Sequence, residues 1–259
     1  MTAPRLHVLT ALNAPDTVIL RRGPSRQIAT YGWNRETGVL TEGQRMAGRI
    51  FPFRSDLAPD GLHWVYHADT GRGGYRTVIA RTPWLRAEAQ IEYADGWGGG
   101  GAFTATGAIW LSGADLPHGT PLRPAAPDAF PGSTDGFHMG DTHATRLRLR
   151  GWQHESSTGY DARLSRALPG GWTLLQGFGR SLPLSASYVL RAPDGTERRM
   201  PWSWADLWGE TLQVASAGRI ARLIDPESGA TEILHDLTGP VFAPRPAPIP
   251  RPGPAPDRR

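Results

Sequence analysis

Two histidines and an aspartate, His138, Asp141 and His143, form the densest group of potential ligand side chains in the sequence. They lie in the segment STDGFHMGDTH. Imidazole and carboxylate groups in such a cluster are able to bind zinc or another divalent cation. The spacing matches no established zinc motif, and the flanking glycines are typical of an ordinary surface loop. We therefore expect a plain loop without stoichiometric metal and keep the three residues as the candidate metal set.

Three arginines, Arg21, Arg22 and Arg26, surround a Gly-Pro turn in ILRRGPSRQ. The planar guanidinium group matches carboxylates and phosphates well, so this cluster is a candidate for binding an anionic partner. A solvated hairpin tip explains the same residues and is the favoured interpretation.

Two further histidines, His63 and His67, lie in the strand-like segment LHWVYHAD. Strand alternation places both on one face, together with Val65. They are candidates for a ligand site, although burial with a structural hydrogen bond is the favoured interpretation.

Three tryptophans, Trp202, Trp204 and Trp208, lie close together in PWSWADLWGE. Packing between sheets is the favoured interpretation. An exposed aromatic platform for a sugar or a peptide is the alternative.

Composition excludes several classes of site. The 259 residues include no cysteine, so disulfides, thiolate metal sites and cysteine nucleophiles are excluded. All 28 basic residues are arginine and the formal net charge is +4. The charge is spread over alternating basic and acidic stretches rather than concentrated on one element, so we do not expect nucleic-acid binding. The glycine-rich segment DGWGGGGAF lacks the Lys-Ser/Thr pair of a phosphate-binding loop.

The N-terminal sequence does not resemble a secretory signal, and no apolar run approaches the ~18 residues that a membrane-spanning helix needs. We expect a soluble, cytoplasmic monomer without a membrane association and without a cofactor.

Short turns with a recurring pattern position these residues. The segments 34–38, 192–196 and 225–229 each place Asn, Asp or Pro before Gly between two β-rich runs, which predicts hairpins. A second unit, APDG at 58–61 and LPGG at 168–171, predicts a tight turn between an inner strand and the next strand outward.

These hairpins predict four-stranded antiparallel modules of roughly 40–50 residues, the size of one propeller blade. The fold class is therefore all-β, a single-domain β-propeller over residues 1–243. We expect five four-stranded blades, with boundaries at 5–50, 51–95, 96–150, 151–203 and 204–243. The third includes a long loop, LPHGTPLRPAAPDAFPGSTDGFHMGD, between an expected strand around GAIWLSG and another at TRLRLRG. An N-terminal strand near LHVLTAL is expected to complete the last blade, because an unpaired edge exposes backbone groups.

The LAPDG and DPESG units resemble the degenerate repeats of TolB-like and WD-repeat β-propellers. The whole chain is similar to a group of uncharacterised bacterial propeller-like proteins of similar length. The GH and WD dipeptides of true WD repeats are missing from their expected places, so the resemblance implies a fold and transfers no catalytic residue.

The C-terminal segment, 244–259, is rich in Pro and Arg. Its prolines cannot donate to a sheet, so we expect a disordered, largely polyproline II tail. It is either a solvated tail or a partner-binding peptide.

These residues predict a non-catalytic binding or scaffolding propeller that recognises a protein or a small ligand at the central mouth or on one rim. The alternatives are a hydrolase of the glycosidase type and a sugar-binding lectin. A glycosidase needs two converging carboxylates. The sequence offers Asp56, Asp60, Asp95 and Asp206 near the expected inner-strand ends, without diagnostic spacing. We assign no catalytic residue.

Overall fold

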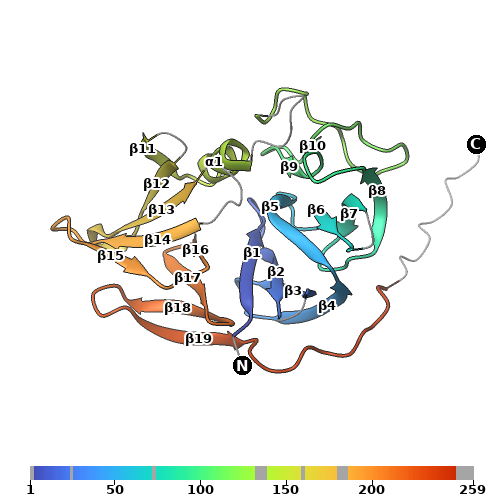
Figure 1. Ribbon diagram of the computed structural model, residues 1–259. Helices are drawn as coiled ribbons and strands as arrows, with labels where there is room; N and C mark the ends of the chain where they lie inside the picture. Colours follow the sequence, from blue (N-terminus) through green and yellow to red (C-terminus); the bar gives the residue numbers. More distant parts are fainter. Residues whose placement is uncertain are drawn as a thin grey trace, which may run out of the picture.

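The protein folds into four antiparallel sheets arranged as the blades of a propeller, with β1 (Arg5–Thr10) and helix α1 (Met139–Leu149) near the centre (Figure 1). The computed structural model describes residues 3–23, 26–71, 74–131, 139–158, 161–179 and 186–248. Within each blade the strands follow one another in chain order, so every blade is a meander. The predicted all-β, propeller-like fold is confirmed, and the resemblance to β-propellers holds at the level of fold.

The first two blades coincide with the predicted modules. The first blade contains β1, β2 (Asp16–Arg22), β3 (Gln27–Asn34) and β4 (Leu40–Ala47). The second blade contains β5 (Arg49–Leu57), β6 (His63–Asp69), β7 (Tyr75–Arg81) and β8 (Ala87–Tyr93).

The other two blades occupy the C-terminal half. The third blade has five strands, β11 (Gln153–Thr158), β12 (Asp161–Ala167), β13 (Thr173–Gly179), β14 (Ala186–Arg191) and β15 (Glu197–Met200). A short 3-10 turn, Pro169–Gly171, joins β12 to β13. The fourth blade contains β16 (Trp204–Trp208), β17 (Thr211–Ser216), β18 (Arg219–Asp225) and β19 (Ala230–Asp236).

The prediction of five blades is wrong, because residues 96–150 do not form one. Two three-residue strands, β9 (Gly101–Phe103) and β10 (Ile109–Leu111), pair as an isolated hairpin. The segment TRLRLR, expected as a strand, lies within helix α1. The hairpin and the helix together take the place between the second and third blades.

Hydrophobic cores between neighbouring units hold the ring together. One core joins the first and second blades, one joins the first and fourth, one joins the second blade to the β9–β10 hairpin, and the largest joins that hairpin to the third and fourth blades. Their buried members include, in that order, Leu20 with Trp64, Trp33 with Ile220, Val65 with Ile109, and Trp110 with Leu174 and Val214. Burial of these side chains is the main driving force for the ring.

The ring closes by packing and not by the expected strand exchange. Strand β1 pairs with β2 in the first blade, and the fourth blade draws its strands from residues 204–236 alone. The expectation that an N-terminal strand completes the last blade is therefore wrong. The Ser203 hydroxyl donates to the carbonyl oxygen of Leu6 over 2.8 Å, and the buried core between the first and fourth blades supplies the rest of the closure.

The predicted hairpin turns are confirmed. Gly38 and Gly61 have φ values of 75°, a conformation that glycine adopts without the steric cost of a Cβ atom. At the first turn the Asn34 side-chain oxygen also accepts from the backbone N–H of Thr37 over 2.9 Å, as an Asx turn does.

After β19 the chain crosses back over the first blade. Residues 240–248 have no regular secondary structure. The Arg21 guanidinium group donates to the carbonyl oxygens of Leu237 and Gly239, each over 2.7 Å, and so fixes the start of this C-terminal segment. Of the predicted tail, 244–248 lies in this segment and 249–259 lies outside the described residues.

Candidate functional site

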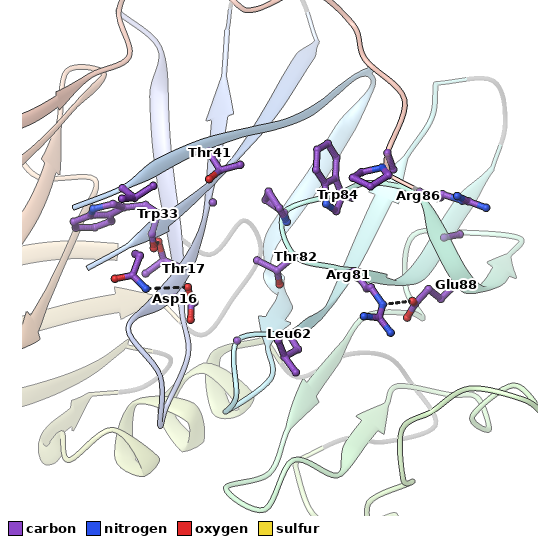
Figure 2. A pocket seen from close by; sticks show the side chains of 18 of the residues that line it. Asp16, Thr17, Trp33, Thr41, Leu62, Arg81, Thr82, Trp84, Arg86 and Glu88 are labelled. Carbon is purple, nitrogen blue, oxygen red and sulfur yellow. Dashed lines mark hydrogen bonds and ion pairs between the residues drawn. The ribbon is translucent and has the colours of Figure 1, made fainter. Parts of the chain in front are cut away.

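A groove of about 1150 Å³ lies between the first and second blades. We call it the rim groove. Its walls come from the ends of β2 and β3, the β3–β4 and β5–β6 turns, the loop between β7 and β8, and a short part of the 119–121 loop. Figure 2 shows lining residues from both blades around this space, among them Thr41 of the first blade and Leu62 and Trp84 of the second.

Two aliphatic side chains on the rim groove are unusually exposed. Leu62 is 60% exposed and Val39 is 59% exposed, and each is at a turn on a different blade. Trp84 also lines the rim groove and is half-buried. Arg81 donates to Glu88 over 2.8 Å on the same wall, so charged groups border the apolar surface. This combination suits a protein segment better than a bulk-polar ligand.

Hydrogen bonds fix the loop that carries Trp84. The Trp64 indole N–H donates to the Trp84 carbonyl oxygen over 2.9 Å, and the Tyr66 hydroxyl donates to the Leu85 carbonyl oxygen over 2.7 Å. The Gln44 side-chain oxygen accepts from the backbone N–H groups of Leu85 and Arg86 over 2.7 and 3.0 Å. The groove is therefore built from backbone that the two blades hold in place.

The C-terminal segment reaches the same groove. Ala247, which is buried, and Pro248 both line it. Upstream, the Phe242 ring lies edge-on to Tyr31 with the ring centroids 5.2 Å apart, and Arg245 forms an ion pair with Glu42. In Figure 2 the C-terminal segment passes beside Trp84 and Arg86.

A second, much smaller cavity of about 50 Å³ lies at the centre of the ring, and we call it the central cavity. Side chains from β1, α1, the third blade and β16 line it, and they include His7, His143, Arg146, Arg150, Trp152 and Gln176. Helix α1 lies between the third blade and the β9–β10 hairpin (Figure 1), contributes side chains to the wall of the central cavity, and packs against β5 and β12.

A buried carboxylate, Asp56 of β5, anchors the helix. One of its oxygens lies 2.6 Å from Arg146 Nη2, and the two oxygens also accept from the backbone N–H groups of Leu57 and Phe103 over 2.9 Å. Arg150, one helical turn after Arg146, donates from Nε to the Thr10 hydroxyl over 3.0 Å. Asp56 thus joins the second blade, the β9–β10 hairpin and α1.

A second buried carboxylate, Asp206 of β16, joins three blades. Arg35, just after β3, donates to one oxygen over 3.0 Å, and Arg166 of β12 donates to the other over 2.8 Å. The Arg35 guanidinium carbon also lies 5.4 and 5.5 Å from the ring centroids of Trp204 and Trp208. Burial lowers the pKa of Arg35 more than the neighbouring Asp206 raises it.

The two histidines of the central cavity are held neutral. Burial, aided by the positive charge of Arg146, lowers the pKa of His7 to about 3. The same two causes hold the pKa of His143 well below its ordinary value. The His143 ring lies edge-on to Phe53 and Phe178, at 5.0 and 4.9 Å between centroids. Both histidines are therefore packing and hydrogen-bonding groups at neutral pH.

The predicted ligand residues His63 and His67 are both buried in the second blade. The Nε2 atom of His63 lies 3.2 Å from a carboxylate oxygen of Glu88. His67 Nδ1 lies 3.1 Å from the Thr77 hydroxyl, and burial followed by the charge of Arg54 lowers the His67 pKa to about 3. The structure places them as interior residues, away from the rim groove lining except through Glu88.

The three predicted arginines separate into different environments. Arg21 is buried and holds the C-terminal segment, as described above. Arg22 is exposed at the end of β2, and Arg26 is exposed and lies 3.7 Å from Asp69. They do not form a shared anion site.

The tryptophan group does not form an exposed platform. Trp202 and Trp204 are buried, in the core of the third and fourth blades and in that of the first and fourth respectively. Trp208 is half-buried against Arg35. Packing between blades, with one cation–π contact, accounts for all three.

The candidate metal residues are not in a loop as expected. Asp141 and His143 lie in helix α1, and His138 lies outside the described residues. Over the described ranges, no group of three or more His, Cys, Asp and Glu side chains is arranged to hold a metal ion.

The four carboxylates considered for glycosidase chemistry do not converge. Asp56 and Asp206 are buried and bound to arginines, whereas Asp60 and Asp95 are exposed and each accepts from a backbone N–H two residues ahead. Each side chain has a structural partner in its own part of the fold.

Sequence reasoning missed the residues that shape both cavities. Leu62 and Trp84 were not singled out, because residues in turns and loops carry no periodic signal. Gln44 was missed because it is one of several polar residues along β4. Arg146 and Arg150 were missed because TRLRLR alternates as a strand does, although His143, Arg146, Leu147 and Arg150 also have the i, i+3, i+4, i+7 spacing of one helix face.

Comparisons with known proteins give little beyond the fold. No family model matches the sequence, and no curated protein matches it. The crystal structure of an uncharacterised protein, lmo1340 from Listeria monocytogenes, is similar with 9% identity and a TM-score of 0.35 over 92% of this chain and 84% of that chain. A "putative 6-phosphogluconolactonase" from Bacteroides uniformis has 12% identity and a TM-score of 0.32 over 89% of this chain and 85% of that chain. TM-scores this low carry no argument about activity.

Helix α1 is also too short and too polar to span a bilayer, and the described part of the chain contains no other candidate span.

Proposed function

We propose that the protein is a non-catalytic recognition module, and that the rim groove binds an extended, proline-containing protein segment. The observation that carries the proposal is the position of Ala247 and Pro248, a piece of extended chain that lies against the groove wall. The position of these two residues supports a groove that accepts such a segment.

The chemistry of the walls supports a proline-rich ligand. Polyproline II segments dock on aromatic surfaces because they are already extended and lose little entropy on binding. The rim groove offers Trp84 beside the exposed Leu62 and Val39. Arg86 on one wall and Asp16 on the other supply charges that orient a ligand, and the hydrogen bonds of Gln44 hold the loop before a ligand arrives.

The central cavity supports this assignment by its size. About 50 Å³ is far below the roughly 300–1,000 Å³ of ordinary small-molecule sites, and side chains of helix α1 form part of its wall. Asp56 and Asp206, the two buried carboxylates considered for the glycosidase alternative, are bound to arginines and are not free to face a sugar.

A labelled synthetic peptide with the sequence of residues 243–259 is a suitable probe, and fluorescence anisotropy measures its binding. The full chain and a chain that ends at Pro248 are compared, because the second keeps every described residue but not the remainder of the tail. We expect saturable binding to at least the shorter chain, with a Kd in the micromolar range that is typical of proline-rich ligands, roughly −8 kcal/mol.

The variants place the site. Leu62→Asp puts a charge on the groove wall and is expected to weaken binding by at least about tenfold, or about 1.4 kcal/mol. Ile224→Asp is the matched control, because Ile224 is 56% exposed in the fourth blade and does not line the groove. Absence of binding to both chains, or equal loss in both variants, would refute the proposal.

A further inference from the structure

Among the described residues, no hydrogen-bond partner is found for three buried polar atoms around the central cavity: Arg146 Nε, Trp152 Nε1 and Gln176 Oε1. All three side chains line the cavity, and they are 7%, 3% and 2% exposed. A buried polar group without a partner costs about 1–3 kcal/mol, so three around one space indicate that something polar occupies it.

The charges at and beside the cavity are unequal. In the part of the chain that the structure describes, four guanidinium groups, those of Arg35, Arg146, Arg150 and Arg166, form ion pairs with two carboxylates, those of Asp56 and Asp206. All of these side chains are mostly buried, with Arg166 the most exposed at 24%. An uncompensated buried charge is costly, because the interior screens it poorly and water does not solvate it fully.

We propose that the central cavity binds one small inorganic anion, of the size of chloride, bromide or nitrate, between Arg146, Arg150 and Trp152. The anion would accept from the unpartnered Arg146 Nε–H and Trp152 Nε1–H groups and offset part of the positive excess. Water alone would satisfy the donors but would leave the charge imbalance.

The remaining wall is compatible with an anion. His7 and His143 are neutral, and a neutral imidazole has an N–H group to donate. The Gln176 amide, whose nitrogen lies 3.2 Å from His143 Nε2 and 3.1 Å from the Tyr188 hydroxyl, presents a donor to the cavity when its oxygen and nitrogen exchange places. Burial also lowers the pKa of Arg146, and an adjacent anion opposes that effect.

Size sets the selectivity. One water molecule needs a cavity volume of about 10–15 Å³. A cavity of about 50 Å³ therefore has room for one small anion and not for an organic acid, a sugar or a nucleotide. The site is thus structural: it would couple the stability of the ring centre to the small anions in solution. It is separate from the rim groove, and neither proposal depends on the other.

The test is thermal unfolding at constant ionic strength, with sodium gluconate, whose anion is too large for the cavity, replaced stepwise by sodium chloride or sodium nitrate. We expect the Tm to rise by several degrees and to saturate, as it does when a ligand binds only the folded state. A Tm that depends on ionic strength but not on the identity of the anion would overturn the proposal.

Three variants locate the effect. Trp152→Phe removes the indole N–H but keeps an aromatic ring, and Arg150→Gln removes one positive charge. Each is expected to shift the anion concentration at half-saturation upward by at least about tenfold, or 1.4 kcal/mol. Arg148→Gln is the matched control on the exposed face of the same helix and is expected to leave it unchanged.

Crystals soaked in sodium bromide give an independent measurement that needs no variant. We expect an anomalous peak within hydrogen-bonding distance of Arg146 Nε and Trp152 Nε1. Density that refines as water, without an anomalous signal, would overturn the proposal even if the variants failed to fold.

Discussion

The central cavity and the rim groove use the two main materials of a protein interior in opposite ways. At the centre, buried Arg146 and Asp56 lie 2.6 Å apart beside a cavity of about 50 Å³. On the rim, exposed Leu62 and Val39 border about 1150 Å³ of open groove. Charged side chains are buried where the blades meet, and apolar side chains are exposed along the open rim groove.

This difference separates the substitutions that should affect stability from those that should affect binding. A buried ion pair is weak evidence of net stabilisation, yet removal of one partner is costly because the other charge stays buried. An exposed apolar side chain contributes little to folding but a large share of an interface. Changes at the centre should therefore lower the stability of the fold, whereas changes on the rim should leave it almost unchanged.

The largest effect is expected from Asp56→Ala. This change leaves the Arg146 guanidinium group buried without its carboxylate and removes the acceptor for two backbone N–H groups. We expect the free energy of unfolding to fall by about 3–5 kcal/mol. Urea unfolding followed by tryptophan fluorescence measures it.

Asp60→Ala is the matched control for this change. Asp60 is exposed in the β5–β6 turn and accepts from the Leu62 N–H over 3.0 Å, so its loss is expected to cost no more than about 1 kcal/mol. If both variants lost the same free energy, Asp56 would not be the anchor that the structure indicates.

The next effect is a dependence of stability on pH. His67 is held by Phe51, Tyr75, Tyr93 and Thr77, and its pKa is lowered from 6.5 to about 3, first by burial and then by Arg54. Because the folded pKa lies below the unfolded one, the stabilisation is fully present above pH 6.5. It is lost as the pH falls from 6.5 towards 3, since the unfolded chain binds the proton first.

Between about pH 5.5 and 4 the slope from His67 alone is about 1.4 kcal/mol per pH unit. The slope of the unfolding free energy against pH should fall by that amount in His67→Asn. Phe51→Leu serves as the control, because it disturbs the same packing (5.5 Å between the ring centroids of Phe51 and His67) but removes no titrating group. An unchanged slope in His67→Asn would show that the imidazole titrates normally.

Much of the fold was predictable because the blades depend on local signals. The hairpins at Asn34–Gly38 and Asp225–Gly229 are set by a side-chain acceptor and a glycine with positive φ, and both are visible in the sequence. Four of the five predicted modules match blades for this reason. The module predicted at 96–150 is wrong because its segment TRLRLR has an alternating Arg-Leu pattern that favours a strand. In the structure this segment is part of helix α1, whose place is set by its tertiary contacts.

The functional residues were less predictable because their roles are non-local. Arg146 is meaningful only beside Asp56, which lies 90 positions earlier. Trp84 and Ala247 meet in the rim groove from distant parts of the chain, and no motif links them. Several histidines and tryptophans that the sequence analysis selected as candidates are buried side chains, because large aromatic groups are common wherever a core forms. They are His63, His67, His143, Trp202 and Trp204.

A moderate effect is expected from Phe242→Ala on the C-terminal segment. Its ring contacts Tyr31 edge-on, a geometry worth about 0.5–1.5 kcal/mol beyond the area it buries, so we expect a loss of about 1–2 kcal/mol. Val39→Ala is the control and should cost about 0.5 kcal/mol or less, since Val39 is 59% exposed. A negligible loss in Phe242→Ala would mean that the segment does not hold its place on the first blade in solution.

The smallest effect belongs to the ion pair between Glu42 and Arg245, whose side chains are 45% and 43% exposed. A double-mutant cycle of Glu42→Gln and Arg245→Gln, measured by urea unfolding, isolates their coupling. We expect about 0.2–1 kcal/mol at low salt, because an exposed pair is solvated and pays side-chain entropy.

Sodium gluconate is the salt to add, since it leaves the central cavity out of the comparison. At about 1 M the Debye length is about 3 Å, so the coupling should vanish. The loss in Asp56→Ala should persist at the same concentration of sodium gluconate, because gluconate is too large to enter the cavity of about 50 Å³ beside the buried Arg146. Equal salt sensitivity at both sites would erase the distinction between a charged centre and an open rim.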